Sequence, residues 1–446
     1  MALPRSGCRV LFADHALTKD AFIEDWHVVC DAFDRLLPGW QSKGRRVVLQ
    51  RFTNLFANII IATVSVLATL GVLEVFVFGL VLKPDDVLPN VTINGVVRYL
   101  PNTEATFRHP DGRESRVSIN ADGWNSPKAS YSVDRVPGRL RIAVIGDSYV
   151  HAGFVNPEEG YPEVIERALQ QRGVDAEVFR FGMDGAPLSQ YLHVLRREVL
   201  RYQPDVVVVG LIHNDFDESY RVRKSRTGSS FMKIAIEAGQ EPIETPPVEF
   251  RPGLADALRN FAAFRYLYYE TNLHIAAKSV VSRAFWGGDD DVALEHISSA
   301  VDVRRIGDHD RNRSLTRYVF GEMKELSARE GFGLLLMMDG VREAIYAGTD
   351  ANAYEVGALN RIAGDTAMTL QLPFIDLQET FSADWKQRRE RFEFSYDWHW
   401  NERGNQLVGE AVTGLLVETF LNGTTLEFAR APARLSGFAS RRPAGG

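Results

Sequence analysis

A serine about a third of the way along the chain and a histidine-aspartate pair near its end have the residue types for nucleophilic catalysis. Ser148 follows the apolar run LRIAVIG (140–146) and Asp147, so we expect it in the tight turn between a strand and a helix. A hydroxyl is exposed there, and the backbone N–H groups of the helix start stabilise negative charge. Asp397 and His399 stand two residues apart, just before a predicted helix. Such a carboxylate can orient an imidazole that takes a proton from a serine, which predicts acyl transfer.

Two further blocks lie between these residues and follow predicted strands. The first, FGMDG, ends at Gly185, and the second, GLIHND, contains Asn214. Glycine allows the backbone to approach a substrate closely, and an asparagine amide donates hydrogen bonds. We therefore predict an oxyanion hole made by Ser148 N–H, Gly185 N–H and Asn214, with Gly182 as a less favoured alternative to Gly185.

Several neighbouring residues are weaker candidates. Taken alone, Gly-Asp-Ser is better explained by an ordinary helix N-cap serine. His151 stands one turn after Ser148. It either contacts substrate or has only a packing role. For His213, a structural role is the favoured interpretation. Four residues are considered as lining the substrate site: Asp147, His213, Trp398 and Trp400.

The elements that would position these residues alternate between strands and helices. Apolar strands of five to seven residues separated by amphipathic helices indicate a parallel sheet covered on both faces, so the fold class is α/β. The segment 83–139 contains turns and short alternating runs, which indicate a β-rich extension. The alternation of strands and helices is interrupted at about 217–315. We predict this region to be a partly helical insertion within a domain spanning 140–425. The last segment, 426–446, is typical of a disordered tail.

Before this domain, the chain has an apolar stretch long enough to cross a membrane. Residues 52–73 carry no charge, and 22 helical residues at 1.5 Å each cover the roughly 30 Å hydrocarbon core of a bilayer. We assign 52–82 to a transmembrane helix. If the span ends at Leu73, Glu74 lies near the outer interface, which we favour; if the helix continues to Leu82, Glu74 lies inside the membrane.

The charged flanks of this stretch predict its orientation. Lys43, Arg45, Arg46 and Arg51 precede it, so residues 1–51 are expected in the cytoplasm and the rest in the periplasm or outside the cell. Both cysteines, Cys8 and Cys30, lie in the cytoplasmic segment, so an oxidising exterior poses no pairing problem.

The order of the four blocks resembles that of the SGNH (GDSL-like) hydrolase family, over roughly 140–420. The resemblance implies a flavodoxin-like three-layer α/β/α sandwich, with Ser148 as nucleophile, His399 as general base and Asp397 as its orienting carboxylate. The family usually spaces these last two as Asp-x-x-His, whereas here one residue separates them. The D-x-H-W-N form looks like that of membrane-anchored relatives of the family.

Together these features predict a membrane-anchored serine esterase that hydrolyses short acyl or carbohydrate O-acetyl esters. Two alternatives remain open: an O-acyltransferase acting on cell-surface polysaccharide, and a non-catalytic glycan-binding module of an export complex. The expected partners are an ester substrate, with acylated polysaccharide as a candidate, and the lipid bilayer. A net charge of −7 gives no basic field for nucleic acid. No metal-ligand spacing or phosphate loop occurs, so we expect neither metal nor cofactor.

Overall fold

The computed structural model describes residues 42–221, 227–237, 240–271, 306 and 308–421. The chain divides into two compact units, Met1–Val75 and Phe76–Gly446. The predictions for the cysteine-containing N-terminal segment and the C-terminal tail lie outside the described residues.

An apolar helix dominates the described part of the first unit. Helix α2 (Ser42–Val72) continues without a break as a π-helix, η1 (Leu73–Leu82). Among the described residues, Gln50–Leu82 is the one stretch long and apolar enough to cross a membrane, and none of its most apolar window is buried. Glu74 therefore lies within a continuous helix, rather than after its end.

The second unit is built on a five-stranded sheet in the order β11-β10-β7-β5-β6, in which every neighbouring pair is parallel. Its strands are β5 (Leu140–Gly146), β6 (Ala176–Gly182), β7 (Val206–Leu211), β10 (Gly333–Met338) and β11 (Phe374–Asp376). The predicted α/β class with a parallel sheet is confirmed. Because β5 lies between β6 and β7, the carboxyl ends of these three strands are adjacent.

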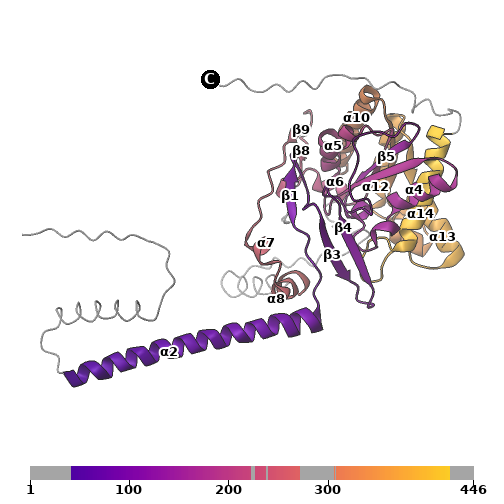
Figure 1. Ribbon diagram of the computed structural model, residues 1–446. Helices are drawn as coiled ribbons and strands as arrows, with labels where there is room; N and C mark the ends of the chain where they lie inside the picture. The colour runs from indigo at the N-terminus through magenta and orange to yellow at the C-terminus, as the bar shows by residue number, and fades with distance from the viewer. Residues whose placement is uncertain (1–41, 222–226, 238–239, 272–305, 307, 422–446) are drawn as a thin grey trace, which may run out of the picture. The chain divides into compact units, whose positions relative to one another are not determined.

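Helices cover both faces of this sheet (Figure 1), because successive side chains of each strand point to opposite sides. Ala143 and Ile145 of β5 pack into one core with α5, α10 and α12, whereas Ile142 and Val144 pack into the other with α4, α13 and α14. The described helices are α3 (Ser148–His151), α4 (Tyr161–Gln171), α5 (Leu188–Arg197), α6 (Asp215–Glu218), α7 (Leu254–Leu258), α8 (Ala262–Phe264), α10 (His309–Glu330), α11 (Arg342–Ala347), α12 (Gly357–Thr369), α13 (Leu377–Arg388) and α14 (Glu402–Leu416).

Short 3₁₀ and π-helical turns connect several of these elements. They are η2 (Pro157–Glu159), η3 (Val199–Tyr202), η4 (Gly228–Ser230), η5 (Arg265–Glu270), η7 (Ala351–Ala353) and η8 (Val417–Leu421). Helix α5 and the turn η3 are separated at Glu198, whose buried carboxylate pairs with Arg98 at 2.7 Å.

Two β-hairpins precede the sheet, as the pattern of segment 83–139 indicates. Strands β1 (Asn90–Ile93) and β2 (Val96–Tyr99) are joined by Asn94 and Gly95, both with positive φ, and β3 (Thr103–Arg108) pairs with β4 (Glu114–Ile119). Asn-Gly is the preferred turn for a two-residue hairpin loop. Several hairpin side chains, among them Val96 and Val117, are fully buried in the core that also contains β5.

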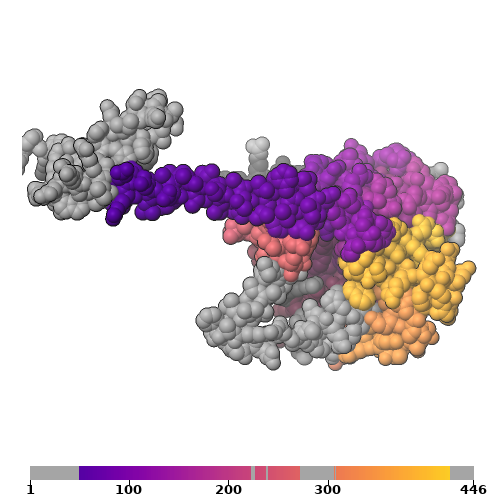
Figure 2. Space-filling view, turned by 90° about the horizontal axis from the view of Figure 1, so that it is seen from below, coloured from indigo at the N-terminus to yellow at the C-terminus, as the bar shows by residue number. Residues whose placement is uncertain are grey.

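The β3–β4 hairpin also meets the C-terminal part of the domain. Arg113 donates to Glu402, the first residue of α14, at 2.7 Å. In the space-filling view, the purple segments of the hairpin region abut the yellow surface of the C-terminal helix (Figure 2). The hairpins are therefore packed parts of the domain.

The region predicted as an insertion contains a third hairpin, β8 (Lys233–Ala235) with β9 (Ile243–Thr245), besides the helical elements α6 to η5. The residues between 272 and 305 lie outside the described part of the chain.

Candidate active site

Ser148 is the first residue of α3, two residues after strand β5 ends at Gly146. The side chain of Asp147 caps this helix by accepting a hydrogen bond from Tyr149 N–H at 2.9 Å. The cap fixes the sharp turn from strand to helix, and so fixes the position of Ser148 at the carboxyl edge of the sheet.

The imidazole of His399 lies against this serine. Ser148 Oγ is 2.7 Å from His399 Nε2, a hydrogen-bonding distance across 251 positions of the sequence. On the other side of the ring, Nδ1 is bonded to a carboxylate oxygen of Asp397, which also accepts the backbone N–H of His399 at 2.7 Å. The one-residue spacing between Asp397 and His399 therefore brings the carboxylate to the imidazole.

The pKa values of the pair shift in opposite directions. Burial alone would lower the pKa of His399, but the hydrogen bond and the charge of Asp397 outweigh it and hold that pKa above its ordinary value. Burial alone would raise the pKa of Asp397, but its bonds to His399 hold that pKa below its ordinary value. The carboxylate is therefore charged at neutral pH and favours the protonated form of the His399 imidazole.

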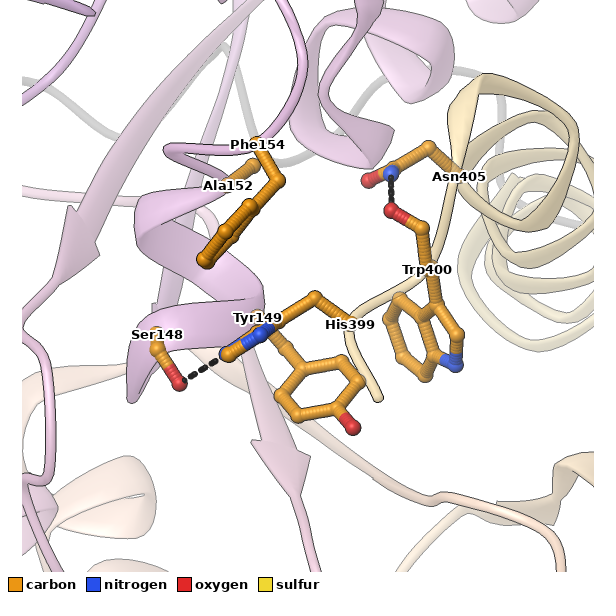
Figure 3. Close-up of a pocket in the computed structure, with 7 residues that line it drawn as sticks. All are labelled: Ser148, Tyr149, Ala152, Phe154, His399, Trp400 and Asn405. Atoms are coloured by element: carbon orange, nitrogen blue, oxygen red, sulfur yellow. Dashed lines mark hydrogen bonds between the residues drawn. The ribbon is translucent and has the colours of Figure 1, made fainter. Parts of the chain in front are cut away.

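Two aromatic rings hold the imidazole in place. Tyr149 and Phe154 contact the ring of His399 at centroid distances of 4.7 and 4.8 Å, and Phe154 is stacked on it. Figure 3 shows the dashed bond from Ser148 to His399, with Tyr149 and Phe154 beside it. The small space among these residues and Trp400 leaves no room for a water molecule. Sequence reasoning did not single out Tyr149 or Phe154, although both stand within six residues of Ser148.

A buried ion pair supports the loop that carries His399. Arg342 pairs with Asp339 at 2.8 Å, and both side chains are at most 2% exposed. Arg342 also donates to the hydroxyl of Tyr149 at 3.2 Å, and that hydroxyl donates to the carbonyl of Trp398 at 2.7 Å. The pair thus reaches the backbone next to His399. In the sequence, Asp339 ends the apolar run GLLLMMD. This pattern indicates a strand but no supporting role for the aspartate.

The predicted oxyanion-hole residues lie at or just beyond the carboxyl ends of the two strands that flank β5. Gly182 is the register partner of Gly146 at the end of β6, and Gly185 follows in the next loop with a φ of +69°. Asn214 lies three residues after β7 ends and is half-buried. The topology brings all three loops to one edge of the sheet.

Gly182 has a clear packing reason to be glycine. A Cβ at this position would lie 2.1 Å from the backbone nitrogen of His151. Only glycine therefore allows α3 to close onto β6. Gly185 has open space where its Cβ would be and the left-handed backbone that favours glycine.

Three of the four residues considered for substrate lining are interior residues in the structure. Asp147, His213 and Trp400 are at most 2% exposed. Asp147 caps α3, His213 Nε2 lies 2.8 Å from Asn360 Oδ1, and Trp400 donates to Asp339 at 3.3 Å. Each of these side chains is occupied in packing and hydrogen bonding within the protein, and a contact with substrate stays a prediction for all three. Trp398 is half-buried, so its side chain remains a candidate.

Asp147 nevertheless titrates unusually. Burial raises its pKa to about 7, against the opposing effects of the Tyr149 N–H and of the charge on His399. Burial and the nearby Asp147 also raise the pKa of Asp215. Asp215 accepts hydrogen bonds from the Tyr191 hydroxyl and from the backbone N–H of Ile212. Two buried carboxyl groups thus interact with each other next to Ser148. In the part of the chain that the structure describes, no cluster of three His, Cys, Asp or Glu side chains could hold a metal ion.

A hydroxyl, an imidazole and a carboxylate joined in this order at the edge of a parallel sheet define a serine hydrolase. Residues 142–264 match the model of the GDSL-like lipase/acylhydrolase family, so the chain carries a domain of this family of ester-bond hydrolases. The match includes Ser148, Gly185 and Asn214 and ends before Asp397 and His399. The latter two are placed at the site by the geometry alone.

Solved structures with this type of domain are remote from the chain. An acetyl xylan esterase is 16% identical over 62% of this chain and 98% of its own, with a TM-score of 0.34. A lipase/acylhydrolase from Enterococcus faecalis is 13% identical over 62% and 95%, with a TM-score of 0.34. A two-domain esterase active on acetylated mannans is 13% identical over 63% and 49%, with a TM-score of 0.33. A search of curated proteins found no match.

The buried ion pair gives a prediction about stability. Replacing Arg342 by methionine leaves the Asp339 carboxylate buried without its arginine, which should lower the free energy of unfolding by about 3–5 kcal/mol. Arg329→Met is the matched control, because its pair with Glu330 is exposed and should be worth at most about 1 kcal/mol.

Thermal and urea unfolding of the detergent-solubilised chain would measure both variants. Adding Asp339→Asn to Arg342→Met removes the uncompensated charge and should recover part of the loss. Equal effects of Arg342→Met and Arg329→Met would contradict the importance assigned to the buried pair.

Proposed function

We propose that this protein is a membrane-anchored serine esterase that cleaves short acyl esters, including O-acetyl esters of carbohydrates, through an acyl-serine intermediate. The observation that carries the proposal is the 2.7 Å contact of Ser148 Oγ with His399 Nε2, with Asp397 bonded to the far side of the imidazole. The match to a family of acylhydrolases supports ester hydrolysis as the reaction.

In the proposed mechanism, Ser148 Oγ attacks the ester carbonyl while its proton passes to His399 Nε2. The backbone N–H of Ser148, the N–H of Gly185 and the side-chain amide of Asn214 stabilise the oxyanion. His399 then gives its proton to the departing alcohol. Water, deprotonated by the same imidazole, attacks the acyl-serine and releases the carboxylic acid and the free hydroxyl.

The same acyl-serine could transfer its acyl group to a sugar hydroxyl in place of water. That acceptor would make the protein an O-acyltransferase of cell-surface polysaccharide. We favour hydrolysis, because water needs no acceptor site and the family match is to hydrolases. The two reactions are separated by incubating an acetylated polysaccharide with an unacetylated acceptor. Hydrolysis releases free acetate, whereas transfer places acetyl groups on the acceptor.

The apolar helix supports the proposed anchoring. Its 33 residues from Gln50 to Leu82 suffice to cross a bilayer, and basic residues precede it in the sequence. We place residues 1–51 in the cytoplasm and the esterase domain in the periplasm or outside the cell. The chain is then held where polymeric esters of the cell surface are within reach.

The nucleophile is tested with p-nitrophenyl acetate. The full chain in detergent should hydrolyse this ester, and Ser148→Ala should lower kcat/KM at least about a thousandfold, because the attacking oxygen is lost. Ser314→Ala, at an exposed position of α10, is the control and should match the wild type. Full turnover by Ser148→Ala would remove Ser148 from the mechanism, and a wild type that binds glycans without turnover would favour the binding-module alternative.

The histidine is tested by the pH dependence of kcat/KM. His399 acts as a base only when neutral, so activity should rise with pH through a pKa that Asp397 holds above the ordinary value. In Asp397→Asn the charge is lost while burial remains, so the rise should move to lower pH. The plateau rate should fall by a factor on the order of 10⁴. An unmoved pH profile would show that Asp397 does not act on His399.

The orientation is tested with the two native cysteines. A membrane-impermeant maleimide should leave Cys8 and Cys30 unlabelled on intact spheroplasts and label them after permeabilisation. In a variant whose only cysteine is Ser132→Cys, an exposed position of the esterase domain, labelling should occur without permeabilisation. Labelling of the native cysteines on intact spheroplasts would reverse the assigned topology.

A further inference from the structure

A cleft of about 360 Å³ lies next to the loop that carries the proposed oxyanion donor Gly185. One wall is the loop after β6, including Asp184 and Gly185. The other wall comes from the β-hairpin region that precedes the sheet. Its volume lies at the lower end of the roughly 300–1,000 Å³ typical of small-molecule sites. The hairpins thus complete a cavity that the sheet and its loops do not form alone.

The cleft combines aromatic rings with hydrogen-bond acceptors. Among the described residues, those that give it this character are Asp86, Asn90, Tyr99, Phe107 and Asp184, and the remaining lining is mostly apolar. No described lining residue is cationic. Carboxylate and amide oxygens accept hydrogen bonds from hydroxyl groups, and aromatic faces pack against the C–H faces of a ring.

The two carboxylates are not equivalent. Asp86 accepts a hydrogen bond from Thr106 N–H and lies 3.5 Å from the guanidinium of Arg265. Asp184 is 53% exposed, and the ion-pairing group within 4.0 Å of it is His151. Burial lowers the pKa of His151 and so disfavours its charged form, and the described residues place no other ion-pairing group within 4.0 Å of Asp184. Asp184 is therefore the stronger acceptor for a ligand hydroxyl.

Ring contacts connect the cleft to the catalytic residues. Phe107 stacks with Phe154 at 5.9 Å, and Phe154 stacks with His399 at 4.8 Å. On the neighbouring side, Tyr99 contacts His151 at 4.6 Å, and His151 lies on α3 with Ser148. A ligand in the cleft would thus lie beside the residues that hold the nucleophile and the base.

From this geometry we infer that the cleft binds the sugar of an O-acetylated neutral glycan while the acetyl group reaches Ser148. The inference rests on the proposed esterase function and adds the sugar-binding subsite and its charge preference. Hydroxyl groups of the sugar donate to Asp184, and its ring packs against Phe107. A uronic acid is disfavoured, since its carboxylate would approach Asp184 and Asp86.

The test compares substrates that differ in whether they fill the cleft. The full chain in detergent is assayed with acetylated xylo-oligosaccharide, p-nitrophenyl acetate, p-nitrophenyl octanoate and an acetylated oligogalacturonide. Asp184→Asn and Phe107→Ala should each lower the ratio of kcat/KM for the xylo-oligosaccharide to kcat/KM for p-nitrophenyl acetate by about tenfold. Asp310→Asn, whose side chain is 98% exposed on α10, is the matched control and should leave the ratio unchanged.

A charge reversal tests the preference for a neutral sugar. Asp184→Lys should raise the ratio of kcat/KM for the acetylated oligogalacturonide to that for the xylo-oligosaccharide at least tenfold over wild type. A wild type that already prefers the acidic substrate would overturn the inference. The variants could instead change the ratio of kcat/KM for p-nitrophenyl octanoate to that for p-nitrophenyl acetate and leave the glycan ratio unchanged. The cleft would then be an acyl-chain pocket, and the inference would be overturned.

Binding without turnover separates this inference from the esterase proposal. In the Ser148→Ala background, calorimetry with acetylated xylo-oligosaccharide should show binding that Asp184→Asn weakens about tenfold. Such binding in a wild type that hydrolyses no ester would refute the esterase and retain the subsite. Equal binding with and without Asp184→Asn, beside normal esterase activity, would refute the subsite alone.

Discussion

The hydrogen bond between Ser148 and His399 imposes the main constraint on this fold. The two residues are 251 positions apart, so the end of β5 and the loop before α14 must meet at one edge of the sheet. The parallel strand order satisfies this requirement, because it places every strand's carboxyl end on the same edge. Helix α14 is then held from two sides, by close packing on α4 and by the hydrogen bond of Arg113 in the β3–β4 hairpin to Glu402.

The sequence was sufficient for the fold class and for the order of the chemistry-bearing blocks. Buried strands such as β7 are continuous apolar runs, and the apolar residues of helix α4 follow the helical period, so local patterns predict both kinds of element. Helices α10 and α13 were not assigned. Both have long polar and charged stretches, and their position is decided by packing on the sheet, which no local pattern reports.

The polar residues beside the site were harder to interpret, since burial cannot be read from residue type. Asp147, His213 and Trp400 have functional side chains and stand next to the blocks, yet each is enclosed and bonded to a structural partner. Conversely, Arg342 and Asp339 gave no catalytic signal. Their contribution depends on a contact with Tyr149 that is 193 positions distant in the sequence, so only the folded chain brings it about.

The β-hairpins illustrate how an element outside the sheet can act on the chemistry. In sequence they are short, turn-rich pieces, and they were expected to be an extension apart from the core. In the structure, Val96 and Val117 are buried with the sheet, and Phe107 stacks directly on Phe154, the phenylalanine that stacks on His399. A rigid core transmits small displacements through such contacts. The β3–β4 hairpin that helps to wall the cleft is therefore also in contact, through Phe107 and Phe154, with the imidazole of His399.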